Sequence, residues 1–270
     1  MPDRLVPNAV AAVDVVLFTV RASARVDDAW QVLLVQRGDA AFAGHWSLPG
    51  VLLRADETFD EAARRALRSK AGLDARDWYL EQLATFGRPD RDSRGRVISV
   101  AHLALVRTDE LELAPGGDIL QIAWFPISSL PWEELAFDHG DMLRIAIDRV
   151  RSKVRYSWVA FQLLPEKFTL PELRAVYAAI LDPSLVRLNT SNFKKAFSAL
   201  FSTGALVQTG ERAQAERPGR PGELYRFSGP LSGTWRRELR WQGGQSRPRT
   251  PRLAGGLGSS AGPGSSEVAS

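Results

Sequence analysis

The chain has 270 residues, 44% of them hydrophobic, which is enough for one large domain or two modest domains with apolar cores. Cysteine is absent, so disulfide bonds, zinc–thiolate sites and a cysteine nucleophile are excluded. Residues 1–150 hold 17 Lys and Arg against 23 Asp and Glu, a net charge of −6, whereas residues 151–270 hold 18 against 8, a net charge of +10. An acidic half joined to a basic half is typical of a ligand-sensing domain followed by a nucleic-acid-binding domain.

The first half alternates strand-like segments with two amphipathic helices. Apolar and β-branched residues predict strands at 13–20, 31–37, 80–86, 97–106 and 119–125. Helical spacing of apolar residues predicts helices at 56–71 and 138–155. Thr58 and Glu61 form a capping box for the first helix, and Asp138 and His139 are expected to cap the second. These elements indicate a mixed sheet with helices packed against it.

The second half has the order of a winged helix-turn-helix. Helices are predicted at 169–181 and 191–201, followed by strands at 205–209 and 224–227. Thr169 and Glu172 form a second capping box, and a basic turn rich in Pro and Gly at 217–222 would be the wing tip. Gly, Pro and Ser dominate from Trp241 onward, so we expect a disordered tail.

One segment resembles the Nudix box, the pattern G-x5-E-x7-R-E-U-x-E-E-x-G-U in which U is aliphatic. Glu57, Arg65 and the pair Gly72-Leu73 fall in register with it. The glutamates that hold Mg²⁺ or Mn²⁺ in that box fall on Ala66, Ser69 and Lys70 here, and its first glycine falls on Val51. Because these cations need oxygen ligands, the replacements predict a nucleotide-diphosphate pocket without a metal and without catalytic residues.

Further motifs along 13–227 resemble one family, the Nudix-related transcriptional regulators of NAD metabolism (NrtR-like proteins). The marks are WSLPG at 46–50, YLEQL at 79–83, PDRDSRGRVISV at 89–100, KFTL at 167–170, NF at 192–193 and GRP at 219–221. The resemblance implies a repressor of NAD biosynthesis or salvage genes that ADP-ribose releases from its operator, with no required cofactor. It also implies an α+β fold: a Nudix-like α/β/α sandwich at 1–150, a winged helix-turn-helix at 151–230 and the tail at 231–270.

The expected ligand-binding residues are mostly basic. Lys70 and Arg65 lie on the box helix, where a cation can neutralise a diphosphate directly. The charged turn around Gly95 supplies planar donors for phosphate or ribose, and further pocket residues complete the set: Arg37, Trp46, Glu57, Arg88, Arg91, Arg94 and Arg96. Trp46 is a candidate for stacking on adenine or for packing the loop, and Glu57 is a candidate ion-pair partner of Arg65.

The expected DNA-binding residues lie at the start of the second helix of the basic half and at the wing tip. Thr190 and Asn192 are placed to contact base edges, and Lys194 and Lys195 to contact phosphates. Arg217 and Arg220 at the wing tip are candidates for the minor groove. Because such regulators usually bind two half-sites of an operator, we expect a homodimer.

Two alternatives remain open at this stage. The first is a Nudix hydrolase with displaced acids, such as Glu61 or Glu81, acting on ADP-ribose or a related nucleoside diphosphate. The second is a regulator of the same architecture that senses a different sugar nucleotide.

Overall fold

The computed structural model describes residues 8–21, 25–38, 41–75, 78–107, 112–181, 193–195, 197–213 and 222–229. All of them belong to one compact unit, Met1–Leu239. Among the predicted functional residues, Thr190, Asn192, Arg217 and Arg220 lie outside the described residues, as does the tail from residue 230. No described helix is long and apolar enough to cross a membrane.

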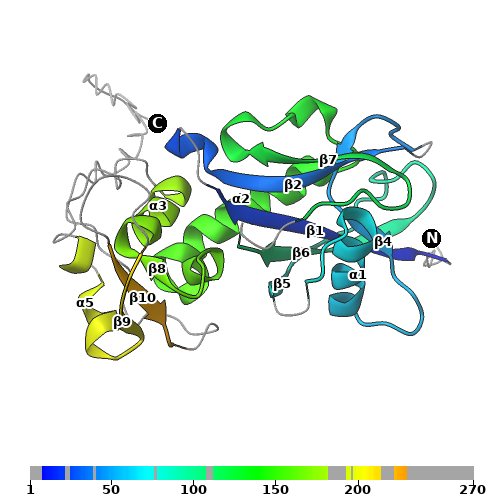
Figure 1. The fold of residues 1–270 in the computed structure, drawn as a ribbon. Coiled ribbons are helices and arrows are strands. Elements are labelled where there is room, and N and C mark those ends of the chain that lie inside the picture. Colours follow the sequence, from blue (N-terminus) through cyan, green and yellow to red (C-terminus); the bar gives the residue numbers. More distant parts are fainter. Residues whose placement is uncertain are drawn as a thin grey trace, which may run out of the picture. The chain divides into compact units, whose positions relative to one another are not determined.

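A mixed seven-stranded sheet forms the centre of the first half (Figure 1). Its main path runs β3-β2-β1-β6-β5, with β4 paired to β1 and β7 paired to β2. The strands are β1 (Val10–Val20), β2 (Trp30–Arg37), β3 (Trp46–Ser47), β4 (Gly50–Leu52), β5 (Tyr79–Phe86), β6 (Val97–Leu105) and β7 (Ile119–Pro126). Strands β1 and β6 are parallel, and the other pairs are antiparallel. The five predicted strands are therefore confirmed, whereas β3 and β4 were missed because they are very short.

Helix α1 (Phe59–Ala71) ends where the sequence predicts and begins directly after the predicted capping residue Thr58, three residues later than the predicted range 56–71. The Thr58 hydroxyl accepts the Glu61 amide while the Glu61 carboxylate accepts the Thr58 amide, which is the reciprocal capping box. The helix ends at Gly72, whose φ of 73° is left-handed and favours glycine. A Cβ at this position would also press against Ala114, so Gly72 lets the chain beyond the helix approach closely.

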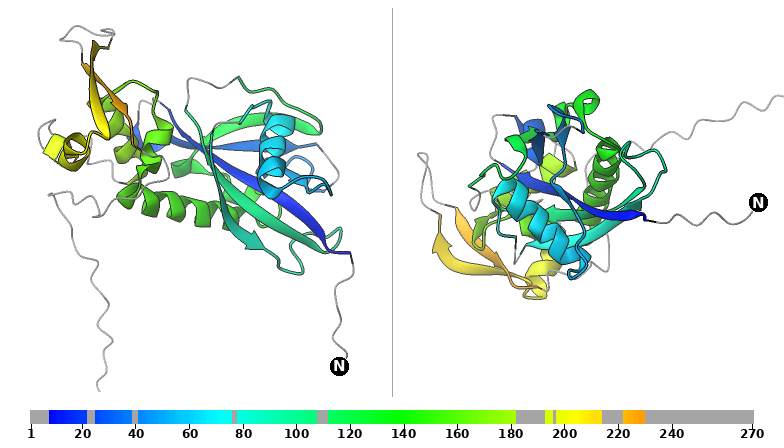
Figure 2. Two further views of the ribbon diagram at one scale, coloured as in Figure 1. Left: turned by 90° about the horizontal axis from the view of Figure 1, so that it is seen from below. Right: turned by 90° about the vertical axis from the view of Figure 1, so that its right-hand side faces the viewer.

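Two helices cover opposite faces of the sheet (Figure 2). The alternate residues Val13, Val15 and Leu17 of β1 share a core with α1. Helix α2 (His139–Tyr156) contacts β1 and β5 instead. Single-turn 3-10 helices lie at η1 (Val26–Asp28), η3 (Ile127–Ser129) and η4 (Trp132–Glu134), and a longer one, η5 (Trp158–Leu163), follows α2. This layering confirms the predicted α/β/α sandwich.

The second half holds a three-stranded sheet with order β8-β10-β9. Its elements are β8 (Phe168–Thr169), α3 (Leu170–Ile180), α5 (Ser198–Ser202), β9 (Leu206–Arg212) and β10 (Glu223–Phe227). Thr169 and Glu172 form the predicted capping box of α3. The buried rings of Tyr177 and Phe193 each pack against the buried ring of Phe197. The helix predicted at 191–201 is interrupted, because residues 193–195 are helical, Phe197 is in a turn and α5 follows.

Candidate ligand pocket and nucleic-acid interface

A pocket of about 460 Å³ lies between helix α1, which carries the Nudix-box residues, strand β4 and the charged turn before β6. Its lining contains six basic side chains, Arg37, Arg54, Arg65, Lys70, Arg91 and Arg94. Against them stand three carboxylates, Asp14, Asp92 and Asp118. Glu57 and Asp138, outside the lining, pair with Arg65 and Arg91, so a smaller excess of positive charge remains, and it suits an anionic ligand.

Glu57 and Arg65 form the expected ion pair of the box helix. Arg65 Nε donates to Glu57 Oε2 at 2.8 Å, and Arg65 also donates to the Leu52 carbonyl. The hydrogen bond from Arg65 lowers the pKa of Glu57 to about 2. Glu57 does not line the pocket, and its second oxygen accepts the Arg54 amide. The pair therefore fixes the loop between β4 and α1 rather than presenting a carboxylate to a ligand.

The positions of the missing glutamates have become apolar, neutral or basic. Ala66 is fully buried in the core between α1 and the sheet. Ser69 Oγ is directed at the Ala66 carbonyl, at 3.5 Å. Within the described residues, no group of three or more His, Asp or Glu side chains is arranged to hold a metal ion. The basic side chains of the pocket can neutralise an anion and donate hydrogen bonds to it.

Lys70 reaches across the pocket to Asp118, with which it forms an ion pair. Partial burial of Asp118 is the largest single influence and raises its pKa, but the hydrogen bond from Lys70, a backbone hydrogen bond and the charges of Lys70 and Arg37 together hold the pKa of Asp118 below its usual range. Lys70 is therefore positioned in the pocket as predicted, already paired with a carboxylate. A phosphate that binds Lys70 must compete with Asp118 for it. Sequence reasoning missed Asp118, which lies 48 residues further along the chain.

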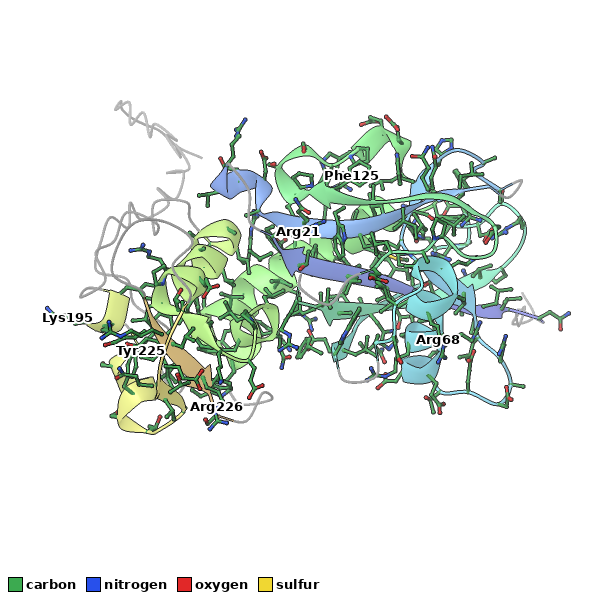
Figure 3. All side chains as sticks on the ribbon, viewed as in Figure 1. Arg21, Arg68, Phe125, Lys195, Tyr225 and Arg226 are labelled. Atoms are coloured by element: carbon green, nitrogen blue, oxygen red, sulfur yellow. The ribbon has the colours of Figure 1, made fainter. Side chains whose placement is uncertain are left out.

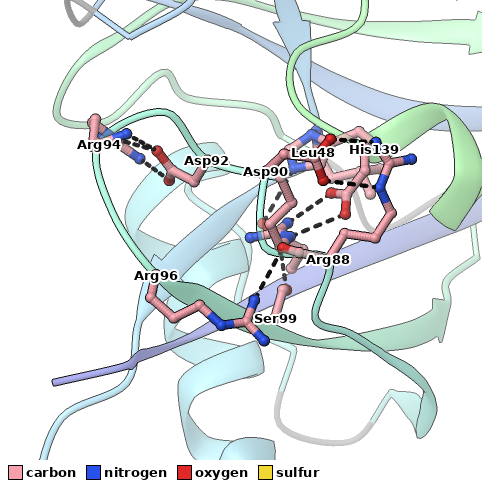
Figure 4. Close-up of polar contacts among 11 residues, drawn as sticks. Leu48, Arg88, Asp90, Asp92, Arg94, Arg96, Ser99 and His139 are labelled. Carbon is pink, nitrogen blue, oxygen red and sulfur yellow. Dashed lines mark hydrogen bonds and ion pairs between the residues drawn. The ribbon is translucent and has the colours of Figure 1, made fainter. Parts of the chain in front are cut away.

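The four arginines of the charged turn at 88–96 differ in their partners and in their burial (Figure 4). Arg88 pairs with Asp90, Arg94 pairs with Asp92, and Arg96 donates to the Arg88 carbonyl. Arg91 is buried, with a side chain only 3% exposed. Of the four arginines, Arg91 and Arg94 line the pocket, whereas Arg88 lines an adjoining one.

Asp138 is the N-cap residue of α2 as expected, whereas His139 is the first residue of the helix. The Asp138 side chain makes no capping hydrogen bond. Its carboxylate instead accepts two hydrogen bonds from Arg91, at 3.0 and 2.7 Å. The Asp138 carboxylate pairs with Arg91 instead of capping the helix, because a buried guanidinium is stable only beside acceptors that compensate its charge. His139 Nδ1 accepts the Leu48 amide at 3.0 Å, which ties the start of α2 to the pocket loop.

Asp14 joins this buried cluster from the middle of β1. Its Oδ2 lies 3.7 Å from Arg91 Nη2 and accepts the Ser99 hydroxyl, and its Oδ1 lies 3.6 Å from His139 Nε2. A Cβ at residue 50 would collide with Asp14 Oδ1, so Gly50 is required above it. Burial lowers the pKa of His139 although Asp14 and Asp138 oppose that shift. A lone aspartate in an apolar strand is the one sequence signal that could have located this cluster.

Trp46 lies apart from the pocket lining. Its ring packs edge-on against Phe125, with 4.7 Å between the ring centroids. Of the alternatives for this residue, the geometry favours packing over contact with a ligand.

Two lysines of the expected DNA-binding surface are described, and they differ in environment. Lys194 Nζ lies 4.0 Å from Glu223 Oε2 and 5.7 Å from the centroid of the Tyr225 ring. Lys195 is exposed, and in Figure 3 its side chain points away from the neighbouring ribbon. Lys195 is therefore the more available for a phosphate contact, whereas Lys194 also contacts a wing strand.

Comparison with known proteins matches each half of the chain to a known domain family. The NUDIX domain model matches residues 11–144, and the model of the NrtR DNA-binding winged helix domain matches residues 160–227. The ADPR responsive transcriptional repressor NtrR of Acinetobacter baylyi is 32% identical over 229 residues, covering 82% of this chain and 83% of that protein. The chain belongs to the NrtR family.

Solved structures of an NrtR protein agree with this assignment. NrtR of Shewanella oneidensis is 32% identical, with a TM-score of 0.68 over 85% of this chain and 99% of that chain. The same protein complexed with a 27mer DNA is 31% identical, with a TM-score of 0.67 and the same coverage. The predicted order of a Nudix domain and then a winged helix domain is thus confirmed, whereas boundaries at residues 150 and 230 stay predictions.

The Nudix half of this NrtR-family chain also resembles an enzyme. The ADP-ribose pyrophosphatase of Methanocaldococcus jannaschii is 34% identical over 114 residues, which cover 42% of this chain and 64% of that protein. The chain spans less than two thirds of that enzyme, and Ala66, Ser69 and Lys70 stand where the Nudix box has glutamates.

Proposed function

We propose that this protein is a cytoplasmic, homodimeric transcriptional repressor that leaves its DNA operator when ADP-ribose occupies the Nudix pocket. The regulated genes would be those of NAD biosynthesis or salvage. Its Acinetobacter baylyi relative is an ADPR responsive transcriptional repressor, and its Shewanella oneidensis relative has been solved in complex with DNA. No cofactor is required in this proposal.

The pocket chemistry carries the proposal. Six basic side chains and three carboxylates line the pocket, and Lys70 occupies a position where the Nudix box has a metal ligand. An ammonium at this position repels a divalent cation and attracts a phosphate oxygen directly. We therefore expect the diphosphate of ADP-ribose to bind to side chains, with no metal bridging it.

We propose that helix α2 transmits the effect of ligand binding from the pocket to the DNA-binding half. Its first turn is held by the Arg91–Asp138 pair and by the His139–Leu48 contact at the pocket. Its last turns are held to β5, because Arg149 and Lys153 both pair with Glu81. Helix α2 then runs into η5 and the winged helix. For release to occur, ADP-ribose must bind the off-DNA arrangement more tightly than the DNA-bound one.

Calorimetry with ADP-ribose, in EDTA and separately in Mg²⁺, tests the proposal. We expect heat of binding in both conditions with closely similar affinity. Absence of heat with ADP-ribose, together with heat from another nucleotide sugar in the same panel, would favour the alternative regulator with a different effector.

Hydrolysis of ADP-ribose is the second candidate, and the likeness to a pyrophosphatase favours it. The acids that sequence reasoning offered for it are already engaged: Glu61 caps α1, and Glu81 is bound by Lys153 and Arg149. Incubation with ADP-ribose and Mg²⁺ or Mn²⁺ decides between the two candidates. Turnover that is lost in Glu57→Gln would establish a hydrolase and refute a pure sensor.

A further inference from the structure

Phe137 lies where two cavities meet. Its ring lines both the 460 Å³ pocket and a second pocket of about 300 Å³. Its φ of 53° is left-handed, which is uncommon and strained for a residue other than glycine. Strain of this kind persists where the surrounding structure holds a residue in place, and it is concentrated at ligand sites. The backbone thus directs an aromatic ring to the junction of the two cavities.

Two pocket arginines lie against the Phe137 ring. The Cζ atoms of Arg37 and Arg94 are 4.9 and 5.5 Å from its centroid. Aromatic rings and guanidinium planes both stack on nucleobases. The Arg94 side chain is 53% exposed, so it can move aside for a planar ligand without repacking the core.

Phe42 supports the Phe137 ring on the side of the second pocket. It also has a left-handed backbone, with a φ of 60°, and its centroid lies 4.6 Å from that of Phe137. The second pocket is partly aromatic as well, because Trp132 lines it and Arg144 lies over the Trp132 ring at 4.7 Å. The surroundings of Phe137 therefore offer flat apolar surfaces edged by positive charge.

Other rings near the pocket are already engaged. Phe137 and His139 are the aromatic side chains in its described lining, and His139 is buried with Nδ1 accepting the Leu48 amide. Trp46 packs on Phe125 outside the lining. Phe137 itself contacts the rings of Phe42 and His139, with centroids 4.6 and 5.3 Å away. The part of its ring that Arg37 and Arg94 lie over is therefore where a planar base would stack.

We propose that Phe137, with Arg37 and Arg94, forms the nucleobase subsite of the pocket. A purine base stacks on the Phe137 ring between the arginines, while the cations near α1 bind the diphosphate. This inference rests on the proposed function and adds how the base, rather than the phosphates, is recognised. It replaces Trp46 as the residue that stacks on the base.

The test compares a ligand that has a base with one that has none. We expect Phe137→Leu to weaken ADP-ribose about 10-fold to 100-fold in calorimetry, the scale of one lost base–aromatic contact. Binding of inorganic pyrophosphate, followed by NMR titration, should be unchanged in that variant. Phe137→Tyr should retain wild-type affinity for both ligands. Trp46→Leu is the matched control, and it should not weaken ADP-ribose more than it weakens pyrophosphate.

The outcomes separate this inference from the proposed function. If wild-type protein binds no ADP-ribose, the proposed function and the subsite both fail. If wild-type protein binds it and Phe137→Leu binds equally well, or loses pyrophosphate to the same degree, the subsite alone is refuted. Should Phe137→Leu not fold, nuclear Overhauser effects between adenine protons and the Phe137 ring in the wild-type complex decide: their presence supports the subsite and their absence overturns it.

Discussion

Arg91 and Asp138 are joined by two hydrogen bonds, from Nε at 3.0 Å and from Nη2 at 2.7 Å, although 47 positions separate them in the sequence. Both side chains are buried, with exposures of 3% and 7%. Arg91 lines the ligand pocket and Asp138 directly precedes α2. This pair therefore links the pocket to the helix that leads into the winged helix.

Asp138→Asn should destabilise the protein by about 3 kcal/mol, because the buried Arg91 guanidinium loses its hydrogen-bonded carboxylate and keeps only Asp14, at 3.7 Å, as a charged neighbour. The asparagine amide nitrogen would also face the Arg91 donors without an acceptor. Urea unfolding at pH 7 measures the change. Arg88→Gln is the matched control, since the Arg88–Asp90 pair is exposed and is expected to contribute about 0–1 kcal/mol. Equal losses in the two variants would contradict a structural role for the buried pair.

Protonation of His139 should lower the free energy of unfolding as the pH decreases from about 6.5. Burial lowers its pKa in the folded protein, so the unfolded chain takes up the proton first as the pH decreases from 6.5. Above that pH both states are neutral at this residue and no dependence arises. His139→Asn keeps an acceptor for the Leu48 amide and does not titrate. The loss of stability between pH 7.5 and 5.5 should be smaller in the variant, and an identical loss would contradict the lowered pKa.

Lys70 and Asp118 should have opposite effects on ADP-ribose affinity. Lys70→Ala removes a cation from the pocket and is expected to weaken binding about 10-fold, the scale of a charge-assisted hydrogen bond. Asp118→Asn removes the carboxylate that competes for Lys70, so affinity should rise or stay constant. Calorimetry in EDTA measures both. Weakening by Asp118→Asn as large as that by Lys70→Ala would show that the pair acts as a structural unit instead.

Lys194→Ala together with Lys195→Ala should weaken binding to DNA of any sequence and flatten its salt dependence. The plot of log affinity against log salt has a negative slope, and each lost phosphate contact makes that slope shallower by about 0.9. We expect Lys195→Ala alone to account for most of the change, since Lys194 also contacts the wing residues Glu223 and Tyr225. Fluorescence anisotropy at several salt concentrations measures the slope. A slope unchanged in the double variant would mean that DNA binds elsewhere.

Local signals made much of the fold predictable. The capping boxes at Thr58–Glu61 and Thr169–Glu172 and the left-handed Gly72 set helix ends through contacts a few residues apart, so sequence spacing was sufficient. Strand β1 was predicted from local sequence as well, because apolar and β-branched residues dominate 13–20 despite Asp14 and Thr19. By contrast, β4 has three residues and exists only because it pairs with β1.

The pocket was less predictable, because its key contacts join distant segments. Arg91 was expected to face a ligand with the other arginines of its turn, yet Asp138 and Asp14 hold it in the interior. Trp46 was a candidate for stacking, but Phe125 from β7 covers it. No local pattern specifies which of several similar charges becomes buried, since that depends on the approach of another strand or helix.

The affinity of the protein for DNA fragments that it enriches from the genome of its source organism, measured in EDTA with and without ADP-ribose, is the most direct test of ligand-controlled repression. We expect ADP-ribose to lower that affinity by at least tenfold while remaining intact, a coupling of about 1.4 kcal/mol. DNA affinity that does not change when ADP-ribose is bound, or release that requires cleavage of ADP-ribose, would contradict a metal-free sensor that controls a winged helix.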